Sequence, residues 1–203
     1  MLRKIKCIGI CFLLAASVWS GTVIADRQRL HQELVRFHIV ANSDSQADQS
    51  LKLQVRDAIL ESLRDGIRDI KDPEQAKAYL RETLPKIREV AEDTIEKAGY
   101  SFPVSVNLQE EAFPVRDYET FRLPSGVYQS LRVVIGNGEG HNWGCVVFPT
   151  LCTPATAEGF EETAQCADFP DSLTAALEGK EEYELRFYFL DVLGKLENFL
   201  FAG

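Results

Sequence analysis

The sequence predicts an α+β fold, in which two N-terminal helices pack on a mostly antiparallel sheet. Between residues 46 and 99 apolar side chains recur every three or four positions, as on one face of a helix. From residue 100 onward, short runs alternate apolar and polar side chains, as in half-buried strands. A helical first half followed by a strand-rich second half is typical of the α+β class.

The first 25 residues have the composition of an export signal. Basic residues near the start precede an apolar run over residues 7–25, and Val23 and Ala25 stand where signal peptidase recognises small side chains. The length of the run nearly reaches the roughly 20 residues that cross a bilayer, so an uncleaved membrane anchor is the alternative to a signal peptide. In both cases we expect residues 26–203 to form a single domain outside the cell.

Acidic residues outnumber basic ones, 31 against 22, which gives the chain a net charge of −9. Three of the basic residues belong to the predicted signal, so the exported part is more acidic still. Nucleic acids and anionic lipid headgroups are bound by clusters of Lys and Arg, and an acidic surface repels them. We therefore expect no nucleic-acid partner, and membrane contact only through the N-terminal segment if that segment stays uncleaved.

The first predicted strand, residues 34–40, is rich in branched and aromatic side chains, which favour a buried or half-buried strand. It ends at a cluster of short polar side chains that includes Asn42, Ser43 and Asp44. Such side chains bond to nearby backbone groups, so a cap between strand and helix is the favoured interpretation. Direct contact of these three residues with a partner is the alternative.

A first helix is predicted directly after this cluster. Ser45 followed three positions later by Asp48 is an acceptable capping pattern for a helix over residues 46–65. Gly66 is expected to lie beyond the end of that helix, because glycine often terminates helices.

The second helix has clearer ends. Asp72 is a good N-cap residue, Pro73 suits the first helical position, and Gly99 follows the last apolar residue of the pattern. Pro85 lies inside the pattern, so we expect it to bend the helix or to divide it into two pieces.

Strands are predicted for residues 102–108, 128–135 and 144–148, where the pattern changes to alternation and β-branched residues are frequent. Residues 123–126 are typical of a turn before the second of these strands. Residues 153–170 have weak periodicity and are interpreted as a surface loop. The elements predicted beyond that loop are a helix over residues 171–178, a strand over residues 183–190 and a helix over residues 191–201.

The most chemically loaded segment runs from residue 136 to residue 152 and contains four glycines, an imidazole, an indole and two thiols. Glycine permits positive φ angles and close approach to another surface, so we interpret the glycines as elements that shape a recognition loop. An exposed tryptophan there would be a typical interface anchor, and a core position is the alternative for it. The candidate partner-binding residues of this segment are Gly138, Gly140, Asn142, Trp143, Phe148 and Pro149.

Three cysteines, Cys145, Cys152 and Cys166, lie outside the predicted signal. In an oxidising exterior an odd number permits at most one disulfide within the chain. Cys145 and Cys152 are the candidate pair, provided that the chain turns back at residues 148–150. Two ordinary buried thiols are the alternative.

A cysteine hydrolase with Cys145 as nucleophile and His141 as base is the enzymatic alternative. If residues 141–145 are extended, the two side chains lie about 13 Å apart, whereas a base must come within roughly 3 Å of its nucleophile. An extracellular thiol near another cysteine is also prone to oxidation. The histidines lack i, i+4 spacing and no C-x-x-C occurs, so we predict no catalytic residue, no metal and no cofactor.

A series of short motifs is spread over residues 35–190. They are Ala41-Asn42-Ser43-Asp44; Leu51-Lys52 with Val55-Arg56-Asp57; Pro124, Gly126, Tyr128 and Leu131-Arg132; Gly138, Gly140, Asn142-Trp143, Cys145-Val146, Phe148-Pro149 and Cys152; and Arg186-Phe187. In order and spacing these motifs resemble the stage II sporulation protein R family. Two positions depart from the family pattern: Gly144 stands where a second tryptophan is expected, and Thr150 where a second proline is common.

The resemblance implies a role in endospore formation. Members of this family are expected to be made in the forespore and exported into the space between the forespore and mother-cell membranes. There they trigger a membrane-embedded aspartic protease, which removes the pro-sequence of a mother-cell sigma factor. The resemblance thus implies a secreted signalling protein and not an enzyme, with that protease as its partner. An exported envelope-binding module without a signalling role is the remaining alternative.

Overall fold

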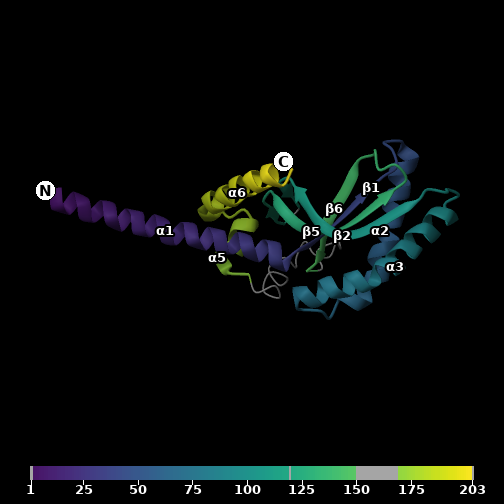
Figure 1. Cartoon of the computed structure of the whole chain (residues 1–203), viewed down its shortest axis with the longest axis horizontal. Coiled ribbons are helices and arrows are strands. Elements are labelled where there is room, and N and C mark those ends of the chain that lie inside the picture. The colour runs from purple at the N-terminus through teal and green to yellow at the C-terminus, as the bar shows by residue number, and fades with distance from the viewer. Residues whose placement is uncertain (1, 119, 150–168, 203) are drawn as a thin grey trace.

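A four-stranded sheet lies at the centre of the computed structural model, with helices on both of its faces (Figure 1). The structure describes residues 2–118, 120–149 and 169–202. In spatial order the strands are β2 (Val104–Phe113), β5 (Gly126–Ile135), β1 (Val35–Val40) and β6 (Asn142–Phe148). Only the pairing of β1 with β5 is parallel, and the other two pairings are antiparallel. The predicted α+β class with a mostly antiparallel sheet is therefore confirmed.

Two long helices, α2 (Gln46–Ile67) and α3 (Pro73–Lys97), cover one side of the sheet, which we call the first face (Figure 1). Every second side chain of the strands points into this layer, because successive side chains of a strand alternate between faces. Phe37 of β1 and Leu131 of β5 are both fully buried there, in one continuous apolar core with the inner sides of the two helices. The two predicted N-terminal helices on the sheet are thus confirmed.

The helix ends follow the predicted chemistry. Ser45 Oγ accepts a hydrogen bond from the backbone N–H of Asp48 at 3.1 Å and caps α2. Asp72 Oδ2 accepts from the backbone N–H of Gln75 at 2.9 Å and caps α3. Pro85 lies inside α3 without dividing it, so the helix continues as one element to Lys97.

The end of α2 differs from the prediction, because Gly66 lies inside the helix and not beyond it. A Cβ atom at Gly66 would lie 2.1 Å from the hydroxyl oxygen of Tyr79 on α3. The missing side chain therefore allows Tyr79 to pack against α2, and glycine serves close helix packing here instead of termination.

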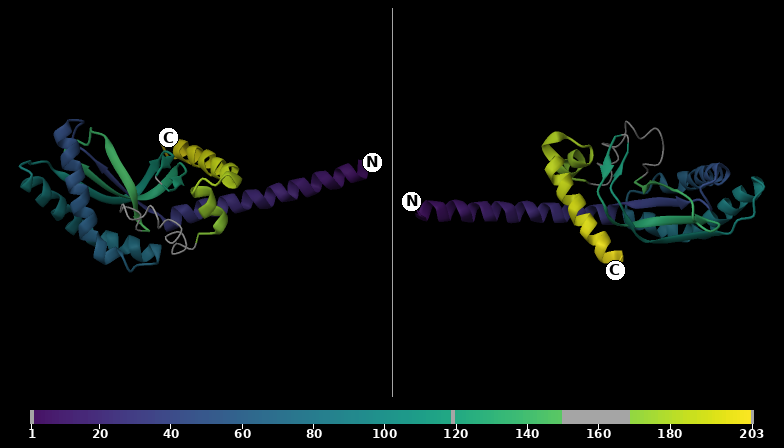
Figure 2. Two further views of the ribbon diagram at one scale, coloured as in Figure 1. Left: turned by 180° about the vertical axis from the view of Figure 1, so that it is seen from behind. Right: turned by 90° about the horizontal axis from the view of Figure 1, so that it is seen from above.

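The second face of the sheet is covered at one end only. α5 (Asp171–Leu177), α6 (Glu184–Ala202) and the C-terminal part of α1 (Leu2–Glu33) pack there, on the opposite side from α2 and α3 (Figure 2). A short ribbon of β3 (Arg116–Asp117) and β4 (Arg122–Leu123) and a 3₁₀ helix (Glu181–Tyr183) complete the described elements. Residues that form the second apolar core include Leu30, Phe113, Tyr128, Val146, Leu173 and Phe187.

The strand predicted for residues 183–190 is wrong, because this segment belongs to a helix. The 3₁₀ helix ends at Tyr183 and α6 begins at Glu184. The buried positions Phe187, Leu190 and Asp191 follow one another at helical spacing, against the second apolar core. The run is rich in aromatic and branched side chains, so its composition favoured a strand while its period favoured a helix. The helices predicted for residues 171–178 and 191–201 are confirmed within α5 and α6.

α1 projects from the body of the molecule and carries the N-terminus away from the sheet (Figures 1 and 2). It continues without a break past residue 25, where the export signal is predicted to end. Asp26 is buried and forms an ion pair with Arg186 of α6, whose Nε donates to Asp26 Oδ2 at 2.6 Å. Burial raises the pKa of the Asp26 carboxyl. In the part of the chain that the structure describes, no helix combines the length and the apolar character needed to cross a membrane.

Candidate functional site

The glycine loop, residues 136–141, lies against the polar turn, residues 41–45. β1 and β5 are parallel neighbours, so the connections that follow them begin at the same edge of the sheet. The backbone N–H of Gly140 donates to the carbonyl of Ala41 at 3.0 Å. The backbone N–H of Glu139 donates to the carbonyl of Asn42 at 3.2 Å. The loop and the turn therefore form one hydrogen-bonded surface.

Asn42 links the glycine loop to the start of α2 through the two ends of its side-chain amide. Its Oδ1 accepts from the backbone N–H of Asn137 at 3.0 Å, and its Nδ2 donates to Asp48 Oδ2 at 2.9 Å. A Cβ atom at Gly140 would lie 2.2 Å from the carbonyl oxygen of Ser43. The close approach expected of the glycine-rich segment is thus present, and it occurs between two parts of the same chain.

Asp48 holds the polar turn at the start of α2. Ser43 Oγ donates to Asp48 Oδ2 at 2.5 Å, beside the bond from Asn42. These hydrogen bonds, that from Ser43 first, lower the pKa of the Asp48 carboxyl. An ionised carboxylate is also favoured by the positive end of the helix dipole, which lies at this terminus.

Asp44 and His141 join the turn and the loop at the surface. Asp44 Oδ1 accepts from the backbone N–H of His141 at 2.5 Å and also pairs with the imidazole Nδ1 of the same residue. The backbone hydrogen bond, followed by the side-chain one, lowers the pKa of the Asp44 carboxyl. The His141 side chain is 81% exposed, so this pair lies on the outside of the loop.

Lys52 of α2 holds the end of the glycine loop through a hydrogen bond to its backbone. Its ammonium donates to the carbonyl of His141 at 2.9 Å and to Gln49 Oε1 at 2.6 Å, and the residue is only 5% exposed. Burial lowers the pKa of Lys52. Asn42, Ser43, Asp44 and Lys52 therefore support the shape of the glycine loop, while their contact with a partner stays a prediction.

Trp143 lies at the start of β6 and is half-buried at the edge of the first-face core. Its ring meets Phe37 edge to face at a centroid distance of 6.1 Å. The guanidinium of Arg56 from α2 lies 4.6 Å from the centre of the same ring. The indole thus has one side in the core and one side toward the surface, so both interpretations of Trp143 find part of their geometry here.

The remaining candidate residues of the segment lie at different depths. Asn142 is exposed, whereas Phe148 is 3% exposed and Pro149 is also buried. Cys145 is buried on the first face and takes part in a disulfide. Its predicted partner Cys152 lies outside the described residues, so the pairing stays a prediction.

The structure places Cys145 and His141 in different surroundings. Cys145 is 4% exposed within the apolar core, while the His141 ring pairs with Asp44 at the surface. A thiol held in a disulfide cannot serve as a nucleophile. The arrangement therefore gives no support to the hydrolase alternative.

Among the described residues, no group of three or more His, Cys, Asp or Glu side chains gathers as metal ligands would.

Sequence reasoning missed a polar group on the second face. His38 Nδ1 and Glu111 Oε1 form a hydrogen bond of 2.7 Å, Arg132 pairs with the same carboxylate, and Arg36 is buried nearby on β1. The signal was present in the first strand, where Arg36 and His38 alternate with apolar residues. Such alternation indicates that the second face of this strand meets polar surroundings.

The fold and the supported loop define a small α+β domain in which a hydrogen-bonded surface loop lies at one edge of the sheet. The chain belongs to the stage II sporulation protein R family, whose model matches residues 31–158. The matched region contains the four-stranded sheet, α2, α3, the polar turn and the glycine loop.

A relative with the same family description is the stage II sporulation protein R of Bacillus subtilis (strain 168). The chain is 39% identical to it over 120 residues, which cover 59% of this chain and 54% of that relative. The match thus spans about half the length of the relative. No solved structure matches the chain.

Proposed function

We propose that this protein is a secreted signal of endospore formation, which triggers a membrane-embedded aspartic protease to cleave a pro-sigma factor. Membership of the stage II sporulation protein R family is the observation that carries the proposal. The predicted export signal and the acidic composition support an exported ligand, which acts between the forespore and mother-cell membranes.

The supported glycine loop is the contact surface in this proposal. A ligand can activate an enzyme only by binding its active state more tightly than its inactive state. A loop whose shape is fixed before binding loses little conformational entropy in the complex, which favours affinity. The exposed side chains of this surface include those of Asp44, Asn137, Glu139, His141 and Asn142.

Reconstitution tests the proposal directly. The protease and its pro-sigma substrate are combined with and without the purified full chain, and precursor cleavage is followed over time. We expect cleavage only when the chain is present. Equal cleavage in its absence would reject the activator role.

Variants locate the contact surface in the same assay. Asn142→Ala removes an exposed side chain beside the loop and should slow cleavage, because it deletes a polar contact. Glu92→Gln alters an exposed residue of α3, on another part of the surface, and should leave cleavage unchanged. Equal activity of the two variants would move the contact away from the loop.

A strain that lacks the gene provides the cellular test. We expect it to accumulate the uncleaved sigma-factor precursor. Normal processing in that strain would favour the alternative of an envelope-binding module without a signalling role.

A further inference from the structure

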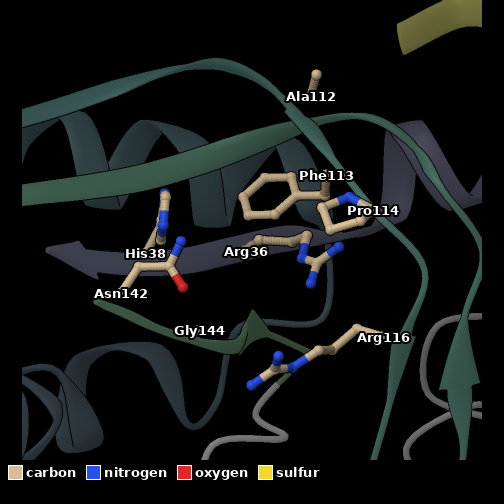
Figure 3. Close-up of a pocket in the computed structure, with 8 residues that line it drawn as sticks. All are labelled: Arg36, His38, Ala112, Phe113, Pro114, Arg116, Asn142 and Gly144. Atoms are coloured by element: carbon tan, nitrogen blue, oxygen red, sulfur yellow. The ribbon is translucent and has the colours of Figure 1, made fainter. Parts of the chain in front are cut away.

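A pocket of about 100 Å³ opens on the part of the second face that the helices leave uncovered (Figure 3). Its polar lining comes from Arg36, His38, Arg116 and Asn142, and its apolar lining includes Phe113. This volume exceeds many times the roughly 10–15 Å³ that a single water molecule needs by the same measure. The pocket can therefore accept a small organic group.

The strand register explains why these side chains meet. His38 of β1 lies opposite Gly144 of β6, and Val40 lies opposite Asn142. Positions 36 and 38 of β1 and positions 142 and 144 of β6 all point to the second face, because their neighbours point into the first-face core. Gly144 carries no side chain, so it leaves room in front of His38.

The guanidinium of Arg36 is the central group of the pocket. The residue is 2% exposed, and its Nη2 donates to the hydroxyl of Tyr118 at 3.3 Å. Its Nε and Nη1 have no hydrogen-bond partner among the residues that the structure describes. The centre of the Phe113 ring lies 3.9 Å from the guanidinium carbon. This cation–π contact offsets part of the free-energy cost of burying the charge. Unpaired N–H groups of a buried cation are costly, so these donors point to an anionic ligand.

The neighbouring charges leave the pocket positive. The carboxylate of Glu111 already forms an ion pair with Arg132, and its Oε1 also bonds to His38 Nδ1. Arg116 of β3 is exposed, and no ion pair is found for it or for Arg36 within the described part of the chain. Figure 3 shows the Arg116 side chain on the other side of the β6 strand from Arg36, beside Gly144, and both arginines line the pocket. Within the residues that the structure describes, two guanidinium groups without an ion pair thus line one small pocket, in a protein that is acidic as a whole.

We infer that this pocket binds a carboxylate carried on a short apolar stem. Guanidinium groups suit carboxylates because their planar N–H donors form charge-assisted hydrogen bonds with them. The exposed amide of Asn142 supplies a further donor at the rim. The walls formed by Phe113 and Pro114 can pack against methylene groups of the stem. Acidic side chains, the C-terminus of a polypeptide and small free carboxylic acids all share this chemistry.

Propionate is the probe for this site. The full chain, labelled with nitrogen-15, is titrated with sodium propionate against sodium chloride at constant ionic strength, and the Nε–Hε resonances of arginine are followed by NMR. We expect a saturable shift of the Arg36 resonance, with a dissociation constant of about 1–10 mM for so small a ligand. Absence of a saturable shift would overturn the inference.

Three variants show whether the shift comes from the pocket. Arg116→Gln changes an exposed residue and should weaken propionate binding about threefold, while Arg36→Gln should weaken it at least about tenfold. Arg88→Gln, at an exposed position of α3, should bind as the unaltered chain does. If Arg36→Gln does not fold, Arg116→Gln decides, and equal affinity of Arg116→Gln and Arg88→Gln would reject the site.

Peptides distinguish the sources of the carboxylate. A short peptide with a free C-terminus is compared with its amidated form and with an amidated peptide that contains an internal Asp. Binding by either carboxylate-bearing peptide, with loss on amidation or on Asp→Asn replacement, supports the inference and identifies the source. Binding of propionate with no peptide binding assigns the site to free acids. All these measurements use the purified chain alone, so they stand or fall independently of the proposed signalling function.

Discussion

The two faces of the sheet are built from the same strands but serve different purposes. The first face is covered by α2 and α3, with which it forms one continuous apolar core. The second face has an apolar core only under α1, α5 and α6, and next to it the polar pocket around Arg36 remains open. Because alternation assigns successive residues of each strand to opposite faces, one face can be devoted to stability while the other carries polar groups. The comparison predicts that substitutions on the first face cost more stability than those on the second.

The largest effect is expected for Phe37→Ala on the first face. Phe37 is fully buried within the first-face core, so truncating it to Ala should lower the free energy of unfolding by about 4 kcal/mol. Phe113→Ala is the matched change on the second face, where the cavity opens toward the pocket and can relax, and it should cost about 2 kcal/mol. Urea unfolding followed by circular dichroism measures both. Equal costs would break the comparison between the two faces.

Trp143→Ala should have an intermediate effect. The indole is half-buried, packs on Phe37 and lies under the guanidinium of Arg56, so its loss should cost about 2 kcal/mol. Trp143→Phe keeps an aromatic ring and should cost less than about 1 kcal/mol. The same unfolding measurement distinguishes these values. A cost near zero for Trp143→Ala would assign the indole to the surface, as an interface anchor.

The fold class and most elements could be predicted from the sequence because their signals are local. Ser45 and Asp72 cap the helices that they were predicted to cap, and Gly99 follows α3 with a φ of 84°. The strand prediction for residues 183–190 was wrong because the composition of this segment favoured a strand while its period favoured a helix. Packing against the second apolar core stabilises the helix.

The site was predictable only in part, since its contacts join residues that are far apart in sequence. The glycines predicted a close approach to another surface. Nothing in the local sequence indicated that this surface would be residues 41–45 of the same chain. The pocket around Arg36 was not predicted, for the same reason. Arg36 and Arg116 come together through strand register and through the β3–β4 ribbon, and neither is encoded by a motif.

Gly140→Ala tests whether the polar turn at the start of α2 holds the glycine loop in place. The new Cβ would lie 2.2 Å from the Ser43 carbonyl, so the loop must move away from the polar turn. We expect a loss of about 1–2 kcal/mol and faster hydrogen exchange at the amide of residue 140, because the displaced loop would lengthen its bond to the Ala41 carbonyl. Gly21→Ala is the control, because a Cβ there meets nothing within 4 Å. Unchanged exchange in the loop would mean that the turn does not hold it.

The smallest effect is a pH dependence that comes from Asp48 at the start of α2. Hydrogen bonds from Ser43 and Asn42 hold its pKa below the ordinary value of 3.8, so the folded state binds this proton less readily than the unfolded chain does. The resulting stabilisation is fully present above the unfolded pKa and is lost as the pH falls through the lower, folded pKa. Urea midpoints measured from pH 6 down to about pH 3 should therefore fall more steeply for the unaltered chain than for Asp48→Asn. Parallel pH profiles of the two proteins would contradict this expectation. They would show that the charge of Asp48 is not needed, and that the amide introduced by Asp48→Asn stabilises the polar turn through the same hydrogen-bond geometry.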